Sequence, residues 1–207
     1  MFLTERIEKA IVRATVLHHF QKRKVSGVPF IVHPYSVAFL LTHYTDDEDV
    51  IIAGLLHDVL EDTPDYTEAM FLEEFGKRPL AIVKEVTEDY SEAEKLDHIL
   101  RGDTSTWHKR KEKYLHNLEN DSQEALLVAA ADKICNMRNI IDEYRSHGEG
   151  IWVSFGRKPE ELVWFYESAN RVISAYLRHP LSVEMDKIYQ ELEATVRSSD
   201  LKNVASN

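Results

Sequence analysis

Apolar residues recur at helical spacing along most of the chain, and short stretches rich in charge, glycine or proline separate the patterns. The first pattern follows Thr4, a candidate N-cap, and consists of Ile7, Ala10, Ile11, Ala14 and Leu17. It predicts a helix that ends near Gln21, followed by a loop over residues 22–32. A second helix is predicted from Pro34, because proline is well tolerated at the first helical position.

A buried helix is predicted next, after the acidic run 46–49. That run is typical of a negatively charged first turn, and residues 50–56 are apolar nearly all round. If the helix continues to Thr63, its polar residues fall within an arc of roughly 140°. They are His57, Asp58, Glu61 and Asp62. Burial of this face is unfavourable unless a cation satisfies it, and a divalent metal is the simplest candidate.

The rest of the chain is also predicted to be helical. The expected helices cover 67–75, 79–86, 106–118, 121–144, 159–177 and 181–196. The stretch 87–104 loses the apolar period and gains charge, which indicates a loop that overhangs a site. Asp121 and Glu124 resemble a capping box. We expect one all-α helical bundle over 1–197 and a flexible tail over 198–207.

Composition agrees with a helical globular protein. Of the 207 residues 43% are hydrophobic, and there are seven glycines and six prolines, so helices are favoured throughout. The single cysteine, Cys135, excludes an internal disulfide framework. Because the start lacks a signal-peptide layout and no apolar span has membrane length, we expect a cytoplasmic protein without a membrane partner.

The net charge of −11 disfavours nucleic acid as a partner, because nonspecific binding depends on many cationic contacts to phosphate. Two basic clusters stand out against this background, at 22–24 and 108–111. The first is equally consistent with a solvated loop and with an anion site. The second is more typical of a solvated helix face.

Metal chemistry has four candidate ligands: His33, His57, Asp58 and Asp132. Asp132 follows six apolar or small residues and shares a helical face with Asn136, so an ordinary surface position is not expected. A structural aspartate that caps a neighbouring helix or bonds an arginine is the alternative. Two imidazoles and two carboxylates suit Mn²⁺, Fe²⁺ or Zn²⁺ better than Ca²⁺.

The order of these residues resembles the HD superfamily of metal-dependent phosphohydrolases, which are all-α proteins. A narrower resemblance is to the hydrolase domain of RelA/SpoT-type alarmone enzymes. It is carried by Arg23-Lys24, Gly27-Val28-Pro29, His33-Pro34, His57-Asp58-Val59-Leu60-Glu61-Asp62-Thr63 and Ala131-Asp132-Lys133-Ile134-Cys135-Asn136-Met137-Arg138.

The resemblance implies a small hydrolase, without a synthetase domain, that converts guanosine tetra- or pentaphosphate to GDP or GTP and pyrophosphate, usually with Mn²⁺. It implies that the metal ligands are His33, His57, Asp58 and Asp132. Glu61 and Asp62 would be the acid/base pair. Arg23 and Lys24 would hold the diphosphate, and Asn136 would contact the ribose of this small-molecule partner.

Three positions depart from the residues that alarmone hydrolases often show: Phe30, Val32 and Cys135. They lie near the loop and pocket that would recognise the base. The sequence therefore leaves two alternatives open, an HD phosphohydrolase of another phosphorylated nucleotide and a non-catalytic metal- or nucleotide-binding regulatory module. It predicts no oligomeric state.

Overall fold

Helices form the architecture of the protein. The computed structural model describes residues 3–88 and 105–205, and within the second range the side chains of 107–197. These ranges contain no β-strand, only an isolated antiparallel bridge between Lys22 and Pro29. The all-α prediction is therefore confirmed. None of the described helices has the length and apolar character needed to cross a membrane.

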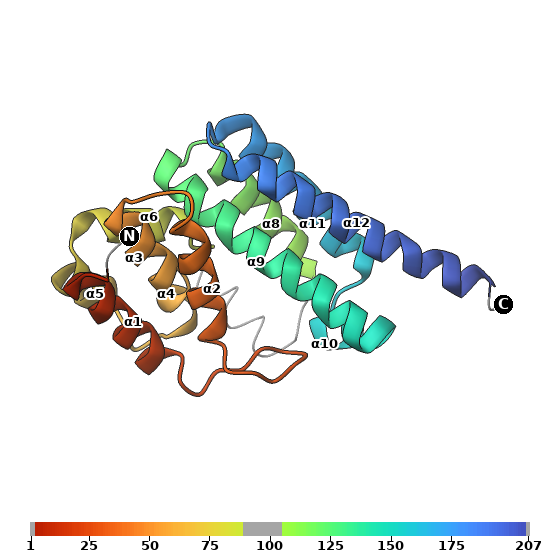
Figure 1. Cartoon of the computed structure of the whole chain (residues 1–207), viewed down its shortest axis with the longest axis horizontal. Coiled ribbons are helices and arrows are strands. Elements are labelled where there is room, and N and C mark those ends of the chain that lie inside the picture. The colour runs from red at the N-terminus through yellow and green to blue at the C-terminus, as the bar shows by residue number, and fades with distance from the viewer. Residues whose placement is uncertain (1–2, 89–104, 206–207) are drawn as a thin grey trace.

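The helices follow one another in the order shown in Figure 1. The first part contains α1 (Glu5–Leu17), α2 (Val32–Leu41), α3 (Glu48–Leu56), α4 (Val59–Asp62), α5 (Glu68–Phe75) and α6 (Lys77–Val86). The second part contains α8 (Ser105–Leu118), α9 (Gln123–His147), the 3-10 turn η1 (Gly148–Gly150), α10 (Ile151–Phe155), α11 (Pro159–Tyr176) and α12 (Leu181–Ala205).

Helix α9 is the element on which the others are arranged. It packs against α2, α3 and α6 from the first part of the chain and against α11 and α12 from the second. Figure 1 shows it between these two groups. Every residue from Ala125 to Ile134 is buried, so this stretch has no solvated face. Any polar side chain within it must therefore find its partners inside the protein.

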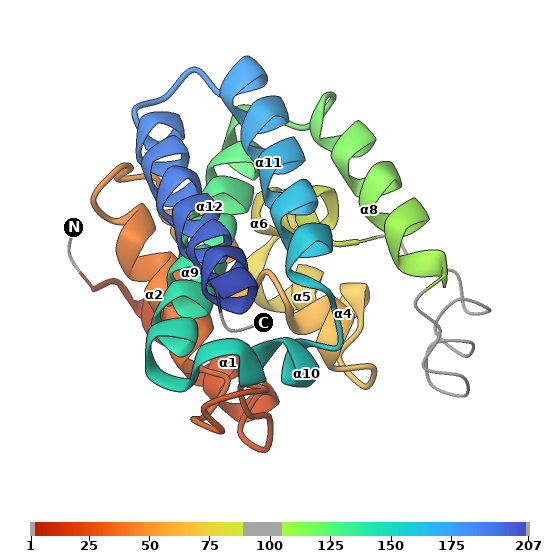
Figure 2. The same ribbon diagram turned by 90° about the vertical axis from the view of Figure 1, so that its right-hand side faces the viewer.

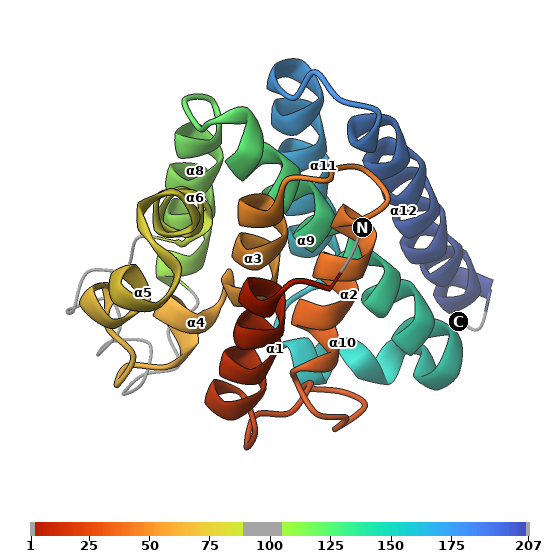
Figure 3. The ribbon, with the colours of Figure 1, turned by 60° about the vertical axis from the view of Figure 1, so that its left-hand side comes forward.

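Helix α3 is buried over its whole apolar stretch, Val50–Leu56, as its composition predicts. Figure 3 shows α3 beside α1 and α2, and it contacts both. The approach of α2 is close at Gly54, where a Cβ atom would overlap Leu41 Cδ1 and lie 3.5 Å from Val37 Cγ1. Glycine at this position lets the second half of α2 lie close against α3.

Capping residues define several helix ends, and the predicted N-cap Thr4 is confirmed. The Thr4 hydroxyl oxygen accepts a hydrogen bond from the backbone of Ile7, and Thr67 caps α5 in the same way. Gly76 ends α5 with φ at 89°, a conformation that favours glycine.

The continuous helix predicted through Thr63 is wrong. Helix α3 ends at Leu56, and His57 and Asp58 form a turn before the short α4. The Asp58 carbonyl accepts from the backbone of Asp62 at 2.8 Å, so it begins a new helix rather than continuing the old one. The break changes the directions of the polar side chains, which a uniform 100° step cannot predict.

Other predicted boundaries need smaller corrections. Helix α1 ends at Leu17 rather than Gln21, and α2 begins at Val32 rather than Pro34. The N-cap of α9 is Ser122, not Asp121, because the Ser122 hydroxyl oxygen accepts from the backbone of Ala125 at 3.2 Å.

At the C-terminus, α12 continues to Ala205, so the predicted end of the helix at residue 196 is wrong. The flexible tail over 198–207 stays a prediction. The predicted loop over 87–104 lies outside the described residues from 89 onward. The single domain over 1–197 stays a prediction.

Replacement of Gly54 tests the importance of the α2–α3 contact. Gly54→Val should lower the free energy of unfolding by about 1–3 kcal/mol, because the added side chain must displace the buried Leu41. Urea unfolding measures the change. Gly150→Val is the control, since nothing lies within 4 Å of a Cβ atom there. Equal losses in both variants would contradict the close-packing argument.

Candidate metal centre

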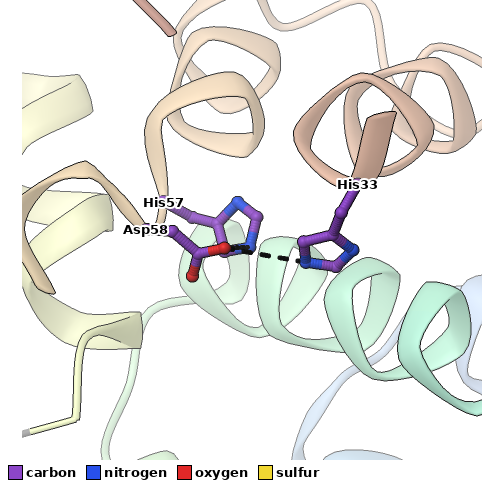
Figure 4. A group of neighbouring side chains, drawn as sticks. All are labelled: His33, His57 and Asp58. Carbon is purple, nitrogen blue, oxygen red and sulfur yellow. Dashed lines mark ion pairs between the residues drawn. The ribbon is translucent and has the colours of Figure 1, made fainter. Parts of the chain in front are cut away.

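Three segments bring two histidines and an aspartate together (Figure 4). His33 lies in the first turn of α2, and His57 and Asp58 form the turn between α3 and α4. One ligand atom from each of the three lies within 4.8 Å of the other two. His57 Nε2 is 3.1 Å from Asp58 Oδ2, and His33 Nε2 is 3.7 Å from the same oxygen.

Asp132 completes the group from the buried middle of α9. Its Oδ1 is 3.0 Å from His33 Nε2 and 3.7 Å from His57 Nε2. The structure therefore brings together all four residues that the sequence analysis singled out as metal ligands. Asp132 bonds Lys133 and Asn136 rather than the arginine of the alternative interpretation.

The orientation of His57 suits a metal ion. Its Nδ1 lies 2.9 Å from the carbonyl oxygen of Gly54, and because that oxygen only accepts, Nδ1 carries the proton. In the neutral ring, the lone pair of Nε2 faces Asp58 and Asp132, and this buried atom makes no hydrogen bond. A backbone bond that fixes one imidazole nitrogen and presents the other is typical of metal-binding histidines. The nitrogen and carboxylate donors fit a borderline divalent ion.

Electrostatics also indicate a site for a cation. Burial alone would lower the pKa of His57, but Asp58 and Asp132 together raise it well above its ordinary value. Burial would raise the pKa of Asp132, yet Lys133 and the two imidazoles hold it well below its usual range. The carboxylates thus favour positive charge between them. A divalent ion would replace the imidazole proton in this role.

A cavity of about 200 Å³ opens beside the four ligands and is also lined by Glu61 and Asp62. Burial, with Glu88 and then Asp58 and Asp62, raises the pKa of Glu61 to about 8. Partial burial and Asp58 raise the pKa of Asp62 to about 6, although its side chain reaches the surface. The two adjacent carboxyl groups therefore differ in protonation near neutral pH, a pattern that suits acid/base chemistry.

Arg23 also lines this cavity, where neutral amides hold its guanidinium group. Its Nε donates to Asn139 Oδ1 at 3.0 Å, and its Nη2 donates to Asn136 Oδ1 at 3.3 Å. Lys24 is exposed and lines a neighbouring pocket of about 450 Å³ that shares Arg23 and Asn136 with the metal cavity. The predicted substrate residues are thus adjacent, but Lys24 is outside the metal cavity itself.

The sequence analysis missed several polar residues of the cavity. They are Glu88, Lys111, Tyr114 and Lys133. Lys133 follows Asp132 directly and donates to its Oδ2 at 2.6 Å. Lys111 was assigned to a solvated helix face, but it lies on the buried side of α8, which packs against α11 (Figure 2). The sequence signal that could have identified Lys111 as inward-facing is its helical spacing from the aromatic residues Trp107 and Tyr114.

Two proteins similar in sequence to this chain are both named guanosine-3′,5′-bis(diphosphate) 3′-pyrophosphohydrolase. The guanosine-3′,5′-bis(diphosphate) 3′-pyrophosphohydrolase of Haemophilus influenzae is 35% identical over 122 residues, 59% of this chain and 17% of that protein. The mouse guanosine-3′,5′-bis(diphosphate) 3′-pyrophosphohydrolase MESH1 is 35% identical over 126 residues, 59% of this chain and 63% of that protein. The chain spans only 15% of a chloroplastic Arabidopsis thaliana relative.

Solved structures share the fold. A metazoan ortholog of SpoT that hydrolyzes ppGpp and plays a role in starvation responses has a TM-score of 0.70 at 23% identity, covering 92% of this chain and 97% of that one. A Listeria monocytogenes protein has a TM-score of 0.63 at 24% identity, covering 84% and 99%. The family described as HD domain matches residues 10–159, most of the sequence. The chain therefore belongs to the HD domain family.

Proposed function

We propose that the protein is a metal-dependent hydrolase that converts ppGpp or pppGpp to GDP or GTP and pyrophosphate. The observation that carries this proposal is the convergence of two imidazoles and two carboxylates beside Glu61 and Asp62, in a cavity that also holds Arg23. The named activities of the bacterial and mouse relatives support it.

The proposed metal ligands are His33, His57, Asp58 and Asp132. Manganese is the proposed ion, and Fe²⁺ or Zn²⁺ would also suit these donors. When bound, the ion supplies a Lewis acid that lowers the pKa of water and neutralises charge on phosphate oxygens. Lys133 Nζ forms an ion pair with Asp132 Oδ2 at 2.6 Å, and this contact fixes the orientation of the carboxylate.

Glu61 and Asp62 are the proposed acid/base pair. Glu61 carries a proton near neutral pH because its pKa is about 8, so it can donate to the 3′-oxygen of the leaving GDP or GTP as the bond from that oxygen to phosphorus breaks. Asp62 is ionised at the same pH and can accept a proton from the attacking water. The Gln21 side chain donates to the Asp62 carbonyl at 3.0 Å, which ties α4 to the basic loop.

Arg23, Lys24 and Asn136 are proposed to bind the nucleotide. Within the described residues, the side chains that accept hydrogen bonds from Arg23 are the neutral amides of Asn136 and Asn139, so its positive charge remains available at the metal cavity. A guanidinium group is well suited to phosphate oxygens. The nucleoside would lie in the neighbouring pocket, with Lys24 at its wall.

A second candidate is hydrolysis of another phosphorylated nucleotide. The pocket beside the basic loop offers Phe30, Val25 and Phe155 as apolar surface, and stacking on such side chains tolerates any base. A regulatory module that binds metal or nucleotide without turnover is the third candidate. The proposed partner is a small-molecule nucleotide, and a cytoplasmic location stays a prediction.

A nucleotide panel tests the substrate. Purified protein with Mn²⁺ should release pyrophosphate and GDP from ppGpp, and a chelator should abolish the release because the reaction depends on the ion. GTP, which has no 3′-diphosphate, is the control and should remain intact. Inertness toward ppGpp, with hydrolysis of another nucleotide in the panel, would favour the second candidate.

Asp58→Ala tests the metal site. Loss of one carboxylate donor should reduce bound Mn²⁺ after dialysis, measured by mass spectrometry, and reduce activity at least about 10²-fold. Asp65→Ala is the control, because Asp65 is exposed beyond α4 and lines none of the described cavities near the ligands. Full metal content in Asp58→Ala would remove Asp58 from the ligand set. Loss of metal with ligand binding retained and no wild-type turnover would favour the regulatory module.

Glu61→Gln separates proton transfer from metal binding. The variant should keep its metal, since Glu61 is not among the proposed ligands, while kcat should fall about 10²–10⁴-fold. Metal analysis and steady-state kinetics on the same sample measure both quantities. Full activity in Glu61→Gln would show that the division between ligands and acid/base residues is wrong.

A further inference from the structure

Lys111 is a cation inside the metal cavity that the proposed mechanism does not use. Its side chain is 16% exposed and lines the cavity together with the metal ligands. It lies on the same side of α8 as the buried residues Trp107 and Tyr114. A lysine is rarely buried without a specific partner, so its position calls for a physical explanation.

Two kinds of contact hold the Lys111 ammonium. It forms an ion pair with Glu88, and it also lies 4.5 Å from the ring centre of Phe165 and 5.9 Å from that of Tyr114. Attraction between an ammonium and ring faces is stronger where water is excluded. The rings would therefore keep the ammonium in place if Glu88 moved away.

Glu88 is less firmly held than Lys111. Its Oε1 pairs with Lys111, whereas its Oε2 is buried and makes no hydrogen bond. It lies close enough to Glu61 to raise the pKa of that residue. Glu88 also lines an adjoining pocket of about 580 Å³, which offers it a place outside the metal cavity.

The other cations of the cavity are already assigned. Lys133 is bound to Asp132 at 2.6 Å, and Arg23 is held by the amides of Asn136 and Asn139. Among the described cavity residues, Lys111 is the cation whose carboxylate partner is not a proposed metal ligand. Exchange of that partner would leave the metal site intact.

We propose that Lys111 binds a phosphate group of the substrate and of the pyrophosphate product, which replaces Glu88 as its partner. This inference rests on the proposed function, since it requires a diphosphate in the metal cavity. Phosphate oxygens satisfy an ammonium as a carboxylate does, and they bring more charge to it. Departure of Glu88 also removes a like charge from beside the incoming anion.

A purely structural ion pair predicts a different outcome. If Lys111 and Glu88 only joined α8 to the end of α6, removal of either partner would have the same effect on phosphate binding. Partner exchange predicts effects of opposite sign, because loss of Lys111 removes the phosphate contact and loss of the Glu88 charge removes its competitor. The two interpretations can therefore be separated by a pair of substitutions.

Isothermal titration of the Mn²⁺-loaded full chain with inorganic pyrophosphate is the test. Lys111→Met should raise the Kd at least tenfold, while Glu88→Gln should bind as tightly as wild type or more tightly. Lys111→Arg, which keeps the charge, should stay within a few-fold of wild type. The readout is binding without turnover, so a failure of ppGpp hydrolysis would not alter it.

Matched controls remove nearby charges of each sign. Lys109→Met takes a charge from the exposed face of α8, and Glu68→Gln takes one from the adjoining pocket, where Glu68 pairs with Lys84 at 2.7 Å. Both should change the Kd less than twofold. Equal weakening by Lys111→Met and Glu88→Gln, or a Lys111→Met no weaker than Lys109→Met, would overturn the inference. If Lys111→Met does not fold, weakened binding by Glu88→Gln alone would overturn it.

Discussion

The fold depends on the neutralisation of polar groups that have been taken out of water. Two imidazoles and two carboxylates meet where α2, the α3–α4 turn and α9 come together, and three of these four residues are buried. Burial of one such charged group without a partner costs on the order of several kcal/mol. Their mutual contacts reduce this penalty only while the three segments keep their spacing. The close approach at Gly54 and the buried stretch of α9 maintain that spacing.

The surroundings of this cluster differ on its two sides. Towards the loop after α1, the cavity joins a pocket with Lys22, Arg23 and Lys24. Towards α6 and α8, it joins a larger pocket whose walls carry Glu68, Glu85 and Asp121. An acidic protein that binds a polyanion needs its positive charge near the reacting group rather than spread over the surface. This distribution supports the proposed position of the nucleotide on the basic side of the metal cavity.

The α8 helix shows why a charge pattern alone is a weak guide to a binding surface. The run 108–111 contains four residues that can carry positive charge, yet the helix turns them in different directions. His108 and Lys109 are exposed, Arg110 is buried, and Lys111 faces the cavity. The ring faces of Tyr114 and Phe165, from two different helices, make the last position suitable for an ammonium.

The sequence by itself determined the helical class, the N-cap Thr4 and the four candidate ligands. Apolar periodicity and capping chemistry act over a few residues, and a buried His-Asp pair is unusual enough to be noticed. Only the tertiary structure decided that α3 stops at Leu56 and that Ser122 caps α9. It also decided the surroundings of Lys111 and Glu88, because the rings, the competing carboxylates and the adjoining pocket come from distant parts of the chain. Local spacing carries no information on which helix will lie opposite a given face, and that is why Lys111 of the second basic cluster was misassigned.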